Sequence, residues 1–307
     1  MLSYLAKRIG MGCLTILATT IAVTLLIHLV PGDPVQIMYA QSQATTPEQI
    51  EAIRHGLGLD QPILLQYLHF MARLAHGDLG YTIRGHQPVV DVILQRLPNT
   101  LLLSGAAMGL AIAIGLPIGF LAAYRHGTLI DTVLMALAIG GVSIPNFWLG
   151  LVLLFAFAVE LEWLPVAGGG ALSVVLPALT LGLSNAAIVA RMTRSAIIDV
   201  MTQDFVRTAH AKGLPKAIVL YRHVLRAGLI PVVAMMGLQF AYMMGGAIVV
   251  ENIFSWNGVG RMAIEAIFQR DYPVIQGFIL VFATTVVLVS ILVDLLYAAL
   301  DPRIRRS

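Results

Sequence analysis

Residues 191–226 read RMTRSAIIDVMTQDFVRTAHAKGLPKAIVLYRHVLR and form a polar, basic stretch in a chain that otherwise consists mostly of long apolar runs. Seven of the chain's 19 Lys and Arg residues lie within it. Its middle, 204–215, is typical of a short helix, because Gly213 can adopt positive φ without a steric penalty and Pro215 prevents continuation. About nine residues at 1.5 Å each give roughly 13 Å, enough to sit in a surface groove. The stretch therefore indicates a cytoplasmic loop of a membrane protein.

The composition of the chain places it among integral membrane proteins. Of its 307 residues 58% are hydrophobic and 11% are charged, and the mean hydropathy is +0.86, which leaves too little polar surface for a soluble domain. A membrane-spanning helix needs roughly 20 apolar residues. Six such runs lie at 9–30, 101–124, 132–159, 171–190, 227–250 and 274–293. The third contains Pro145 near its middle, so we expect it to kink there or to break into two shorter helices.

The distribution of basic residues predicts the orientation of the chain, because Lys and Arg are retained on the cytoplasmic side. With the N-terminus inside, 13 of the 19 basic residues are cytoplasmic, and four of the six outside lie in one long segment where the rule is weak. Both termini are therefore predicted to be cytoplasmic. The net charge of +3 reports this topology and gives no indication of nucleic-acid binding.

The sequence divides into an anchor, an external segment, a core and a tail. We expect an uncleaved N-terminal anchor span at 1–30, because no small-residue cleavage site follows its apolar run. The remaining divisions are an external loop with short helices at 31–98, a five-span core at 99–300 with the cytoplasmic loop 191–226, and a cytoplasmic tail at 301–307. Within the external loop, capping signals and apolar periodicity predict helices beginning at Thr46 and ending by Gly56, at 62–75 and at 88–97.

Polar residues inside the spans are candidates for a translocation path, because each needs a partner or a water-lined face in hydrocarbon. They are Ser143, Asn146, Asn185, Gln239 and Tyr242. For Ser143 and Asn146 the alternative is local hydrogen bonding to backbone groups that Pro145 frees. The pairs Gly105/Gly109 and Gly115/Gly119 have the small-xxx-small spacing that allows two helices to approach closely.

Several motifs are missing from the sequence. It has no phosphate-binding loop of the type G-x-x-x-x-G-K-[ST], no H-E-x-x-H pair, and a single cysteine, Cys13, so neither a nucleotide site nor a metal site is indicated. The spans also lack the series of buried charged residues expected where protons or sodium drive transport. These absences favour a transport subunit, without catalytic residues or cofactors of its own, that takes its energy from another chain.

The motifs resemble those of bacterial ABC importer permeases. The run Arg207-Thr-Ala-His-Ala-Lys-Gly213, followed by His223-Val-Leu-Arg226, is similar to the EAA loop in the variant of the peptide/nickel (dipeptide and oligopeptide) permease family. It departs from the broader superfamily at Arg207, where that superfamily has glutamate, and at Arg226, where it has proline. Similar to the same family are Pro31-Gly-Asp-Pro34, Gly58-Leu-Asp-Gln-Pro62, His76-Gly-Asp-Leu-Gly80, Glu251-Asn-Ile-Phe-Ser-Trp-Asn-Gly-Val-Gly-Arg261, Arg270-Asp-Tyr-Pro-Val-Ile-Gln276 and Asp294-Leu-Leu-Tyr-Ala-Ala-Leu-Asp-Pro-Arg303.

The resemblance implies an all-α membrane protein with six spans, like a type I ABC importer permease, and two functional surfaces. The first is a coupling loop that docks on a cytoplasmic ATPase, in which Phe205 and Ala209 are expected to supply a small apolar face. Its residues are Phe205, Arg207, Thr208, Ala209, His210, Lys212, Gly213, His223 and Arg226. The second is an external gate or a face for a binding protein. Its residues are Glu251, Trp256, Arg261, Arg270 and Asp271.

The resemblance also implies partners and a location. We expect a second homologous permease subunit, two ATPases that carry ATP and Mg, an extracytoplasmic solute-binding protein, and the bacterial cytoplasmic membrane. The cargo would be dipeptides or oligopeptides, moved by alternating access, or alternatively nickel chelates, opines or other small solutes. Two different hypotheses stay open at this point: an ion-coupled secondary transporter or channel, and a membrane-anchored assembly factor.

Overall fold

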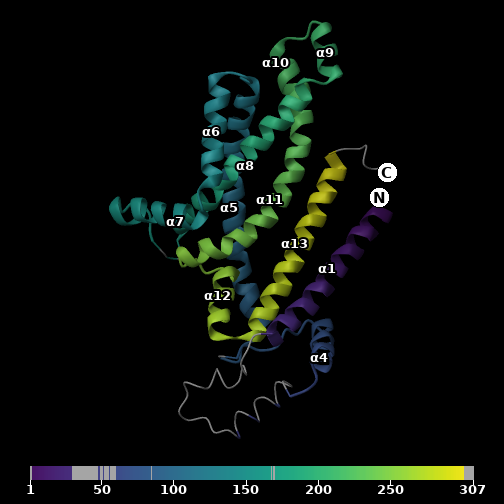
Figure 1. Cartoon of the computed structure of the whole chain (residues 1–307), viewed down its shortest axis with the longest axis vertical. Coiled ribbons are helices and arrows are strands. Elements are labelled where there is room, and N and C mark those ends of the chain that lie inside the picture. Colours follow the sequence, from purple (N-terminus) through teal and green to yellow (C-terminus); the bar gives the residue numbers. More distant parts are fainter. Residues whose placement is uncertain are drawn as a thin grey trace. The chain divides into compact units, whose positions relative to one another are not determined.

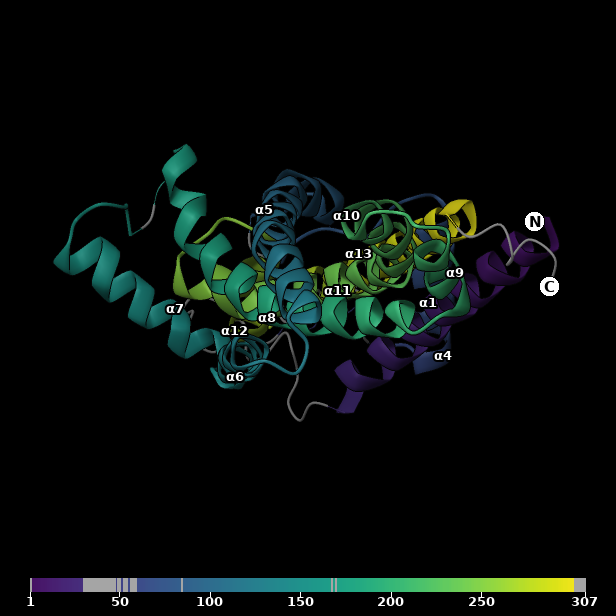
Figure 2. The same cartoon turned by 90° about the horizontal axis from the view of Figure 1, so that it is seen from above.

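The computed structural model describes residues 2–29, 48, 51, 55, 60–83, 85–166, 168 and 170–300. Within them the chain is almost entirely helical, and the only strand pairing is an isolated bridge between Tyr81 and Pro88. Figures 1 and 2 show the helices in two views. The chain forms two compact units, one of residues 1–98 and 262–287 and the other of residues 99–261 and 288–307. The helix expected at Thr46, its end at Gly56 and the tail 301–307 lie outside the described residues.

Unit 1, as we call residues 1–98 and 262–287, contains α1 (Leu2–Leu29) and α4 (Ile63–Ala75), with parts of α5, α12 and α13. The helix predicted at 62–75 is confirmed as α4. The hydroxyl groups of Thr20 in α1 and Tyr67 in α4 are hydrogen bonded at 3.1 Å. Gly277 lies against α5, where a Cβ would come within 2.6 Å of Val89 Cγ1, so glycine allows this close approach.

Unit 2 comprises residues 99–261 and 288–307, and its centre is α8 (Val175–Met201), which packs against α6, α7 and α11. Its core is formed by Leu103, Leu176, Leu181 and Val250, all at most 1% exposed. The other elements are α5 (Val89–Tyr124), α6 (Leu129–Ser143), α7 (Asn146–Leu154), a π-helical turn (Phe155–Glu160), a 3-10 turn (Ala171–Val174), α9 (Asp204–Ala211), α10 (Lys216–Ile218), a second π-helical turn (Val219–Val224), α11 (Leu225–Ile253), α12 (Val259–Gln269) and α13 (Tyr272–Leu300). Figure 1 shows α9 and α10 between the adjoining ends of α8 and α11.

The membrane spans follow the hydropathy of the sequence. Among the described residues five helices are long and apolar enough to cross a membrane, and a bent pair, Leu129–Ser143 and Asn146–Glu160, makes up to six. The two halves of the pair meet at 94°, so the third predicted run breaks at Pro145 instead of kinking gently. Pro145 lies between the helices with ψ 136°, and Ile144 before it is also extended, as expected for a residue that precedes proline.

Two helix boundaries differ most from the sequence prediction. The expected external helix at 88–97 and the span at 101–124 are one continuous helix, α5, so Pro98 lies inside it. A proline in a helix interior removes one backbone hydrogen bond, and long helices of membrane proteins tolerate this loss. The second difference is α8, which continues to Met201 beyond the predicted end at residue 190. Hydropathy locates only the apolar part of a helix. The backbone hydrogen bonds of α8 continue into the polar sequence that follows, so Arg191 and Arg194 are helical.

Candidate functional site

A cavity of about 310 Å³ lies inside unit 2, where the break between α6 and α7 faces α8 and α11. Pro145 creates it, because ending α6 there turns the start of α7 away from the line of the helix. The cavity is lined by Val142, Ile144, Pro145, Asn146, Leu181, Ser184, Asn185, Ile188, Gln239, Tyr242, Met243 and Gly246. None of these twelve side chains carries a charge. The cavity therefore combines apolar walls with a few uncharged polar groups, as ligand pockets commonly do.

The polar groups of the cavity form two hydrogen-bonded pairs. Gln239 Nε2 on α11 donates to Asn185 Oδ1 on α8, and Asn185 Nδ2 donates to the Leu181 carbonyl at 2.7 Å. At the break, Ser184 Oγ donates to Asn146 Oδ1 at 2.7 Å. Asn185 is 6% exposed, so its hydrogen bonds satisfy a buried amide. The pairs connect α8 to α11 and to α7.

Four of the five polar residues that the sequence proposed for a path are brought together at this cavity: Asn146, Asn185, Gln239 and Tyr242. Ser143 is not among the lining residues, and its hydroxyl donates to the Ile139 carbonyl at 2.9 Å. Ser143 therefore makes a local hydrogen bond, but to the carbonyl one helical turn before it and not to a backbone group that Pro145 frees. Ser184 was missed, although its position beside Asn185 in an apolar run was a usable signal.

The short helix α9 at the end of α8 has one buried face and one exposed face. Val206 and Ala209 pack with Ile197, Val200 and Val219 in a core cluster. Phe205 is 41% exposed, so Phe205 and Ala209 do not share an outward face, which corrects the expectation from their spacing. The exposed residues of the predicted coupling loop are Phe205, Arg207, Thr208, His210, Lys212, Gly213 and Arg226, and His223 is half-buried.

The end of α9 follows the sequence prediction. Gly213 has φ +75°, and its N–H donates to the His210 carbonyl at 2.9 Å. Pro215 then precedes α10. No side-chain cap is formed at the start of the helix, where Gln203 precedes Asp204.

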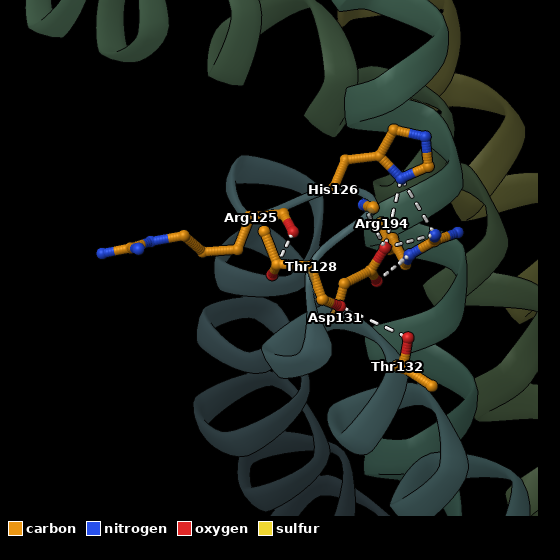
Figure 3. A network of polar contacts seen from close by, with 7 residues as sticks. Arg125, His126, Thr128, Asp131, Thr132 and Arg194 are labelled. Atoms are coloured by element: carbon orange, nitrogen blue, oxygen red, sulfur yellow. Dashed lines mark hydrogen bonds and ion pairs between the residues drawn. The ribbon is translucent and has the colours of Figure 1, made fainter.

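A partly buried ion pair joins α6 to α8 (Figure 3). Arg194 donates from Nε to Asp131 Oδ1 at 2.5 Å and from Nη2 to Asp131 Oδ2 at 2.7 Å. Asp131 also accepts the N–H of Gly127 at 3.0 Å, and its side chain is 5% exposed. The bidentate geometry is the strong form of an arginine–carboxylate pair. The pair therefore fixes the start of α6 to the part of α8 that leads to α9.

His126 completes this network at its more exposed edge. Its Nδ1 lies 3.1 Å from both Asp131 Oδ2 and Arg194 Nη2. The carboxylate oxygen needs a donor and the guanidinium needs an acceptor, so one ring nitrogen serves one of the two partners at a time. The network was missed from the sequence because Asp131 and Arg194 are 63 residues apart, and no local spacing indicates their pairing.

A second buried carboxylate organises the turn between α11 and α12. Glu251 is 0% exposed and accepts hydrogen bonds from the Thr100 hydroxyl at 2.5 Å and from the Arg261 N–H at 3.0 Å. Thr100 in turn accepts the Val259 N–H at 2.9 Å. Gly260 gives the carboxylate room, since a Cβ there would lie 2.8 Å from Glu251 Oε2. Glu251 thus supports the turn from inside, whereas the sequence proposed it for a gate or a partner-binding face.

The other residues proposed for that face lie in two places. In unit 2, Trp256 Nε1 donates to the Asn99 carbonyl at 3.1 Å, and Arg261 Nη1 donates to the Ser255 carbonyl at 2.8 Å. In unit 1, Asp271 is 5% exposed and accepts the Ile83 N–H at 2.9 Å, while Arg270 before it has φ +53°. These contacts shape the turns on both sides of α12. Among the residues that the structure describes, no group of three or more His, Cys, Asp or Glu side chains could hold a metal ion.

The long apolar helices, the bent span and the uncharged cavity define a multi-pass membrane transport protein. Two solved structures share its fold. The MetNI methionine ABC transporter in an inward-facing conformation matches with a TM-score of 0.59 and 19% identity, over 69% of this chain and 97% of that chain. An amino acid ABC transporter matches with a TM-score of 0.55 and 16% identity, over 68% and 94%.

The sequence comparisons identify the family. The family described as "Binding-protein-dependent transport system inner membrane component" matches residues 115–306, and its N-terminal component matches residues 1–104. The chain belongs to this family. It is 43% identical to the glutathione transport system permease protein GsiC of Pectobacterium atrosepticum and 42% identical to that of Escherichia coli K12, in each case over 306 residues and 99% of both chains.

These findings confirm the resemblance that the motifs indicated. The chain is the permease subunit of an ABC importer of the peptide/nickel type and a multi-pass protein of the bacterial inner membrane. It is a transport subunit and not an enzyme. A subunit of this kind works with an ATPase and a binding protein in general.

Proposed function

We propose that this permease moves small peptide-like solutes across the inner membrane by alternating access, and that the cavity at Pro145 is its part of the path. The cavity is the observation that carries the proposal: five polar side chains from α7, α8 and α11 meet there in otherwise apolar surroundings. Polar groups within membrane spans are costly unless they serve packing or a solute. Relatives at 42–43% identity that are glutathione permeases support a short peptide as the cargo.

We further propose that α9 receives the movement of the ATPase. Its buried face is fixed by Val206 and Ala209, so the helix moves as one body with the ends of α8 and α11. Its exposed face offers Phe205, Arg207 and His210 to a partner. One aromatic residue beside basic groups is a composition common at protein interfaces. ATP and Mg would be bound by the partner ATPases, with this loop in the cytoplasm.

The remaining partners complete the assembly. We propose a second, homologous permease subunit, two ATPases, and a solute-binding protein that docks on the external side near the α11–α12 turn. The exposed hydrophobic residues of the spans, such as Leu137 at 68% and Leu238 at 46%, would face lipid or the second permease.

Mass spectrometry of the proteins that co-purify with this chain in mild detergent tests the assembly. An ATPase, a second permease and a binding protein are the expected partners, and a peptide retained by the binding protein would identify the cargo. A retained nickel chelate or opine would replace the peptide cargo while keeping the importer. Copies of this chain alone, with ion-coupled flux that is indifferent to ATP, would overturn the proposed function.

A further inference from the structure

We infer that the cavity contains a subsite for an uncharged amide group, built from Gln239 and Asn146. During passage of a peptide unit, Gln239 accepts from its N–H and Asn146 donates to its C=O. The inference rests on the proposed function and adds the chemistry that the path recognises. Its basis is the hydrogen-bonding capacity left over after the side chains of the cavity have bonded to one another.

The orientation of Gln239 follows from a backbone carbonyl. The Leu181 carbonyl oxygen can only accept, and an amide oxygen 2.7 Å from it would be repelled, so Asn185 must direct Nδ2 towards it, which points Oδ1 at Gln239 on α11. Gln239 must then present Nε2 to that oxygen. Carboxamide orientations are assigned from such networks, and this one leaves a single consistent choice. Gln239 Oε1 makes no hydrogen bond within the described part of the chain, so an acceptor remains at the cavity.

Asn146 supplies the matching donor. Its Oδ1 accepts from Ser184 Oγ at 2.7 Å, and its Nδ2 makes no hydrogen bond to any described residue. The side chain borders the same cavity as Gln239. A peptide group carries one donor and one acceptor, the complement of the acceptor on Gln239 and the donor on Asn146.

The absence of charge among the lining residues decides which part of a solute would occupy the site. A carboxylate or an ammonium group placed there would find no opposite charge among the twelve lining side chains. An amide needs no opposite charge and gains two hydrogen bonds. A volume of about 310 Å³ also lies at the small end of ligand pockets, which suits one or two peptide units.

A pair of solutes that differ by one atom tests the subsite. The fully assembled importer in proteoliposomes is supplied with a short peptide and with the matching depsipeptide, whose ester oxygen replaces one amide N–H. We expect Gln239→Met to lower the peptide-to-ester ratio of uptake by about fivefold to tenfold, the value of one hydrogen bond. Because every variant shares one binding protein, a changed ratio reports the permease. Leu238→Met is the matched control, since Leu238 does not line the cavity.

Asn146→Leu separates the two halves of the subsite. It removes the donor at a similar side-chain size and adds no charge to the cavity, so uptake of peptide and ester should fall together while their ratio stays near the wild-type value. A ratio that Gln239→Met leaves unchanged would overturn the subsite and leave the importer function standing. A wild-type assembly without ATP-dependent uptake of either solute would overturn the proposed function instead.

A labelling measurement tests the same subsite without altering Gln239. Gly246 lines the cavity, and a Cβ there would meet nothing closer than 3.8 Å, so Gly246→Cys fits. In a Cys13→Ser background it is the only cysteine of the chain. We expect the peptide to slow its reaction with a small thiol reagent about fivefold more than the ester does. Equal protection by both solutes would contradict an amide subsite.

Discussion

Gly115 and Gly119 of α5 allow close packing against α8. A Cβ at Gly115 would come within 2.6 Å of the Ala186 carbonyl oxygen, and one at Gly119 would overlap the Ala190 carbonyl. Backbone atoms cannot move aside as side-chain ends can. Gly105 and Gly109 have the same spacing in the sequence, yet a Cβ at either would meet nothing within 4 Å. Of the two small-xxx-small pairs in α5, Gly115/Gly119 lies at a helix contact within this chain and Gly105/Gly109 does not.

We expect Gly119→Ala to destabilise unit 2 by about 1–3 kcal/mol, the usual cost of overpacking. The measurement is the unfolding temperature of the detergent-solubilised chain. Gly105→Ala is the matched control in the same helix, and it should leave stability unchanged or raise it by up to about 1 kcal/mol, since alanine favours helix. Equal effects of the two substitutions would show that the close approach to α8 is not what constrains Gly119.

Thr100 performs two tasks with one hydroxyl group: it donates to the buried Glu251 and accepts the Val259 N–H. Thr100→Val has nearly the same shape but leaves the Val259 N–H and Glu251 Oε1 without this hydroxyl, while Glu251 Oε2 keeps the Arg261 N–H. We expect a loss of about 1–3 kcal/mol in stability, because buried polar groups without partners are costly. Thr100→Ser should retain most of the stability. Unfolding of the purified complex checks this, and a wild-type value for Thr100→Val would mean that the turn does not depend on this hydroxyl.

At the scale of elements, the Asp131–Arg194 pair connects α6 to the end of α8, shortly before α9 begins. Arg194→Gln leaves the Asp131 carboxylate, which is 5% exposed, without its cation and should cost roughly 3–5 kcal/mol, whereas Asp131→Asn leaves Arg194, which is 26% exposed and reaches water, and should cost less. The double substitution should cost less than the sum of the single ones. A double-mutant cycle on unfolding free energies measures the coupling, and strict additivity would show that the pair contributes no interaction energy.

The end of α9 gives a test of the coupling loop. Gly213 has φ +75°, a conformation that β-branched residues avoid and asparagine tolerates. Gly213→Val should reduce retention of the ATPase and ATP-dependent uptake, while the chain still inserts into the membrane. Gly213→Asn is the control and should behave nearly as wild type. Retention and uptake that survive Gly213→Val would count against α9 as the docking element.

Hydropathy predicted the long helices because a long apolar run is visible in consecutive residues. The end of α9 was also predictable from neighbouring residues, Gly213 and Pro215. Contacts between distant residues could not be predicted from one sequence. Thr100 and Glu251 are 151 positions apart, and their pairing depends on how α5 meets α11. Four of the residues that line the cavity could be proposed from the sequence, because a polar group in an apolar run is conspicuous. Their hydrogen-bond partners required the fold.

At the scale of the whole molecule, the bent pair decides how many times the chain crosses the membrane. Five helices span by length and composition, and the pair joined at Pro145 makes a sixth only if it crosses once in total. At 1.5 Å per residue α6 is about 22 Å long, shorter than a hydrocarbon core of about 30 Å, so a crossing needs residues beyond the break. An even number of crossings places both chain ends on one side, and an odd number places them on opposite sides.

We expect six crossings, with both ends in the cytoplasm, as the distribution of Lys and Arg predicts. In the Cys13→Ser background, single cysteines at Ser3 and Ser307 should react with an impermeant maleimide in inside-out vesicles and stay unreactive in intact spheroplasts. Tyr81→Cys, which is exposed and lies in the segment predicted to be external, should show the opposite pattern. Reaction of Ser3→Cys and Ser307→Cys on different sides would mean that the bent pair enters and leaves by the same face. The cavity at Pro145 would then lie in a re-entrant hairpin instead of a broken span.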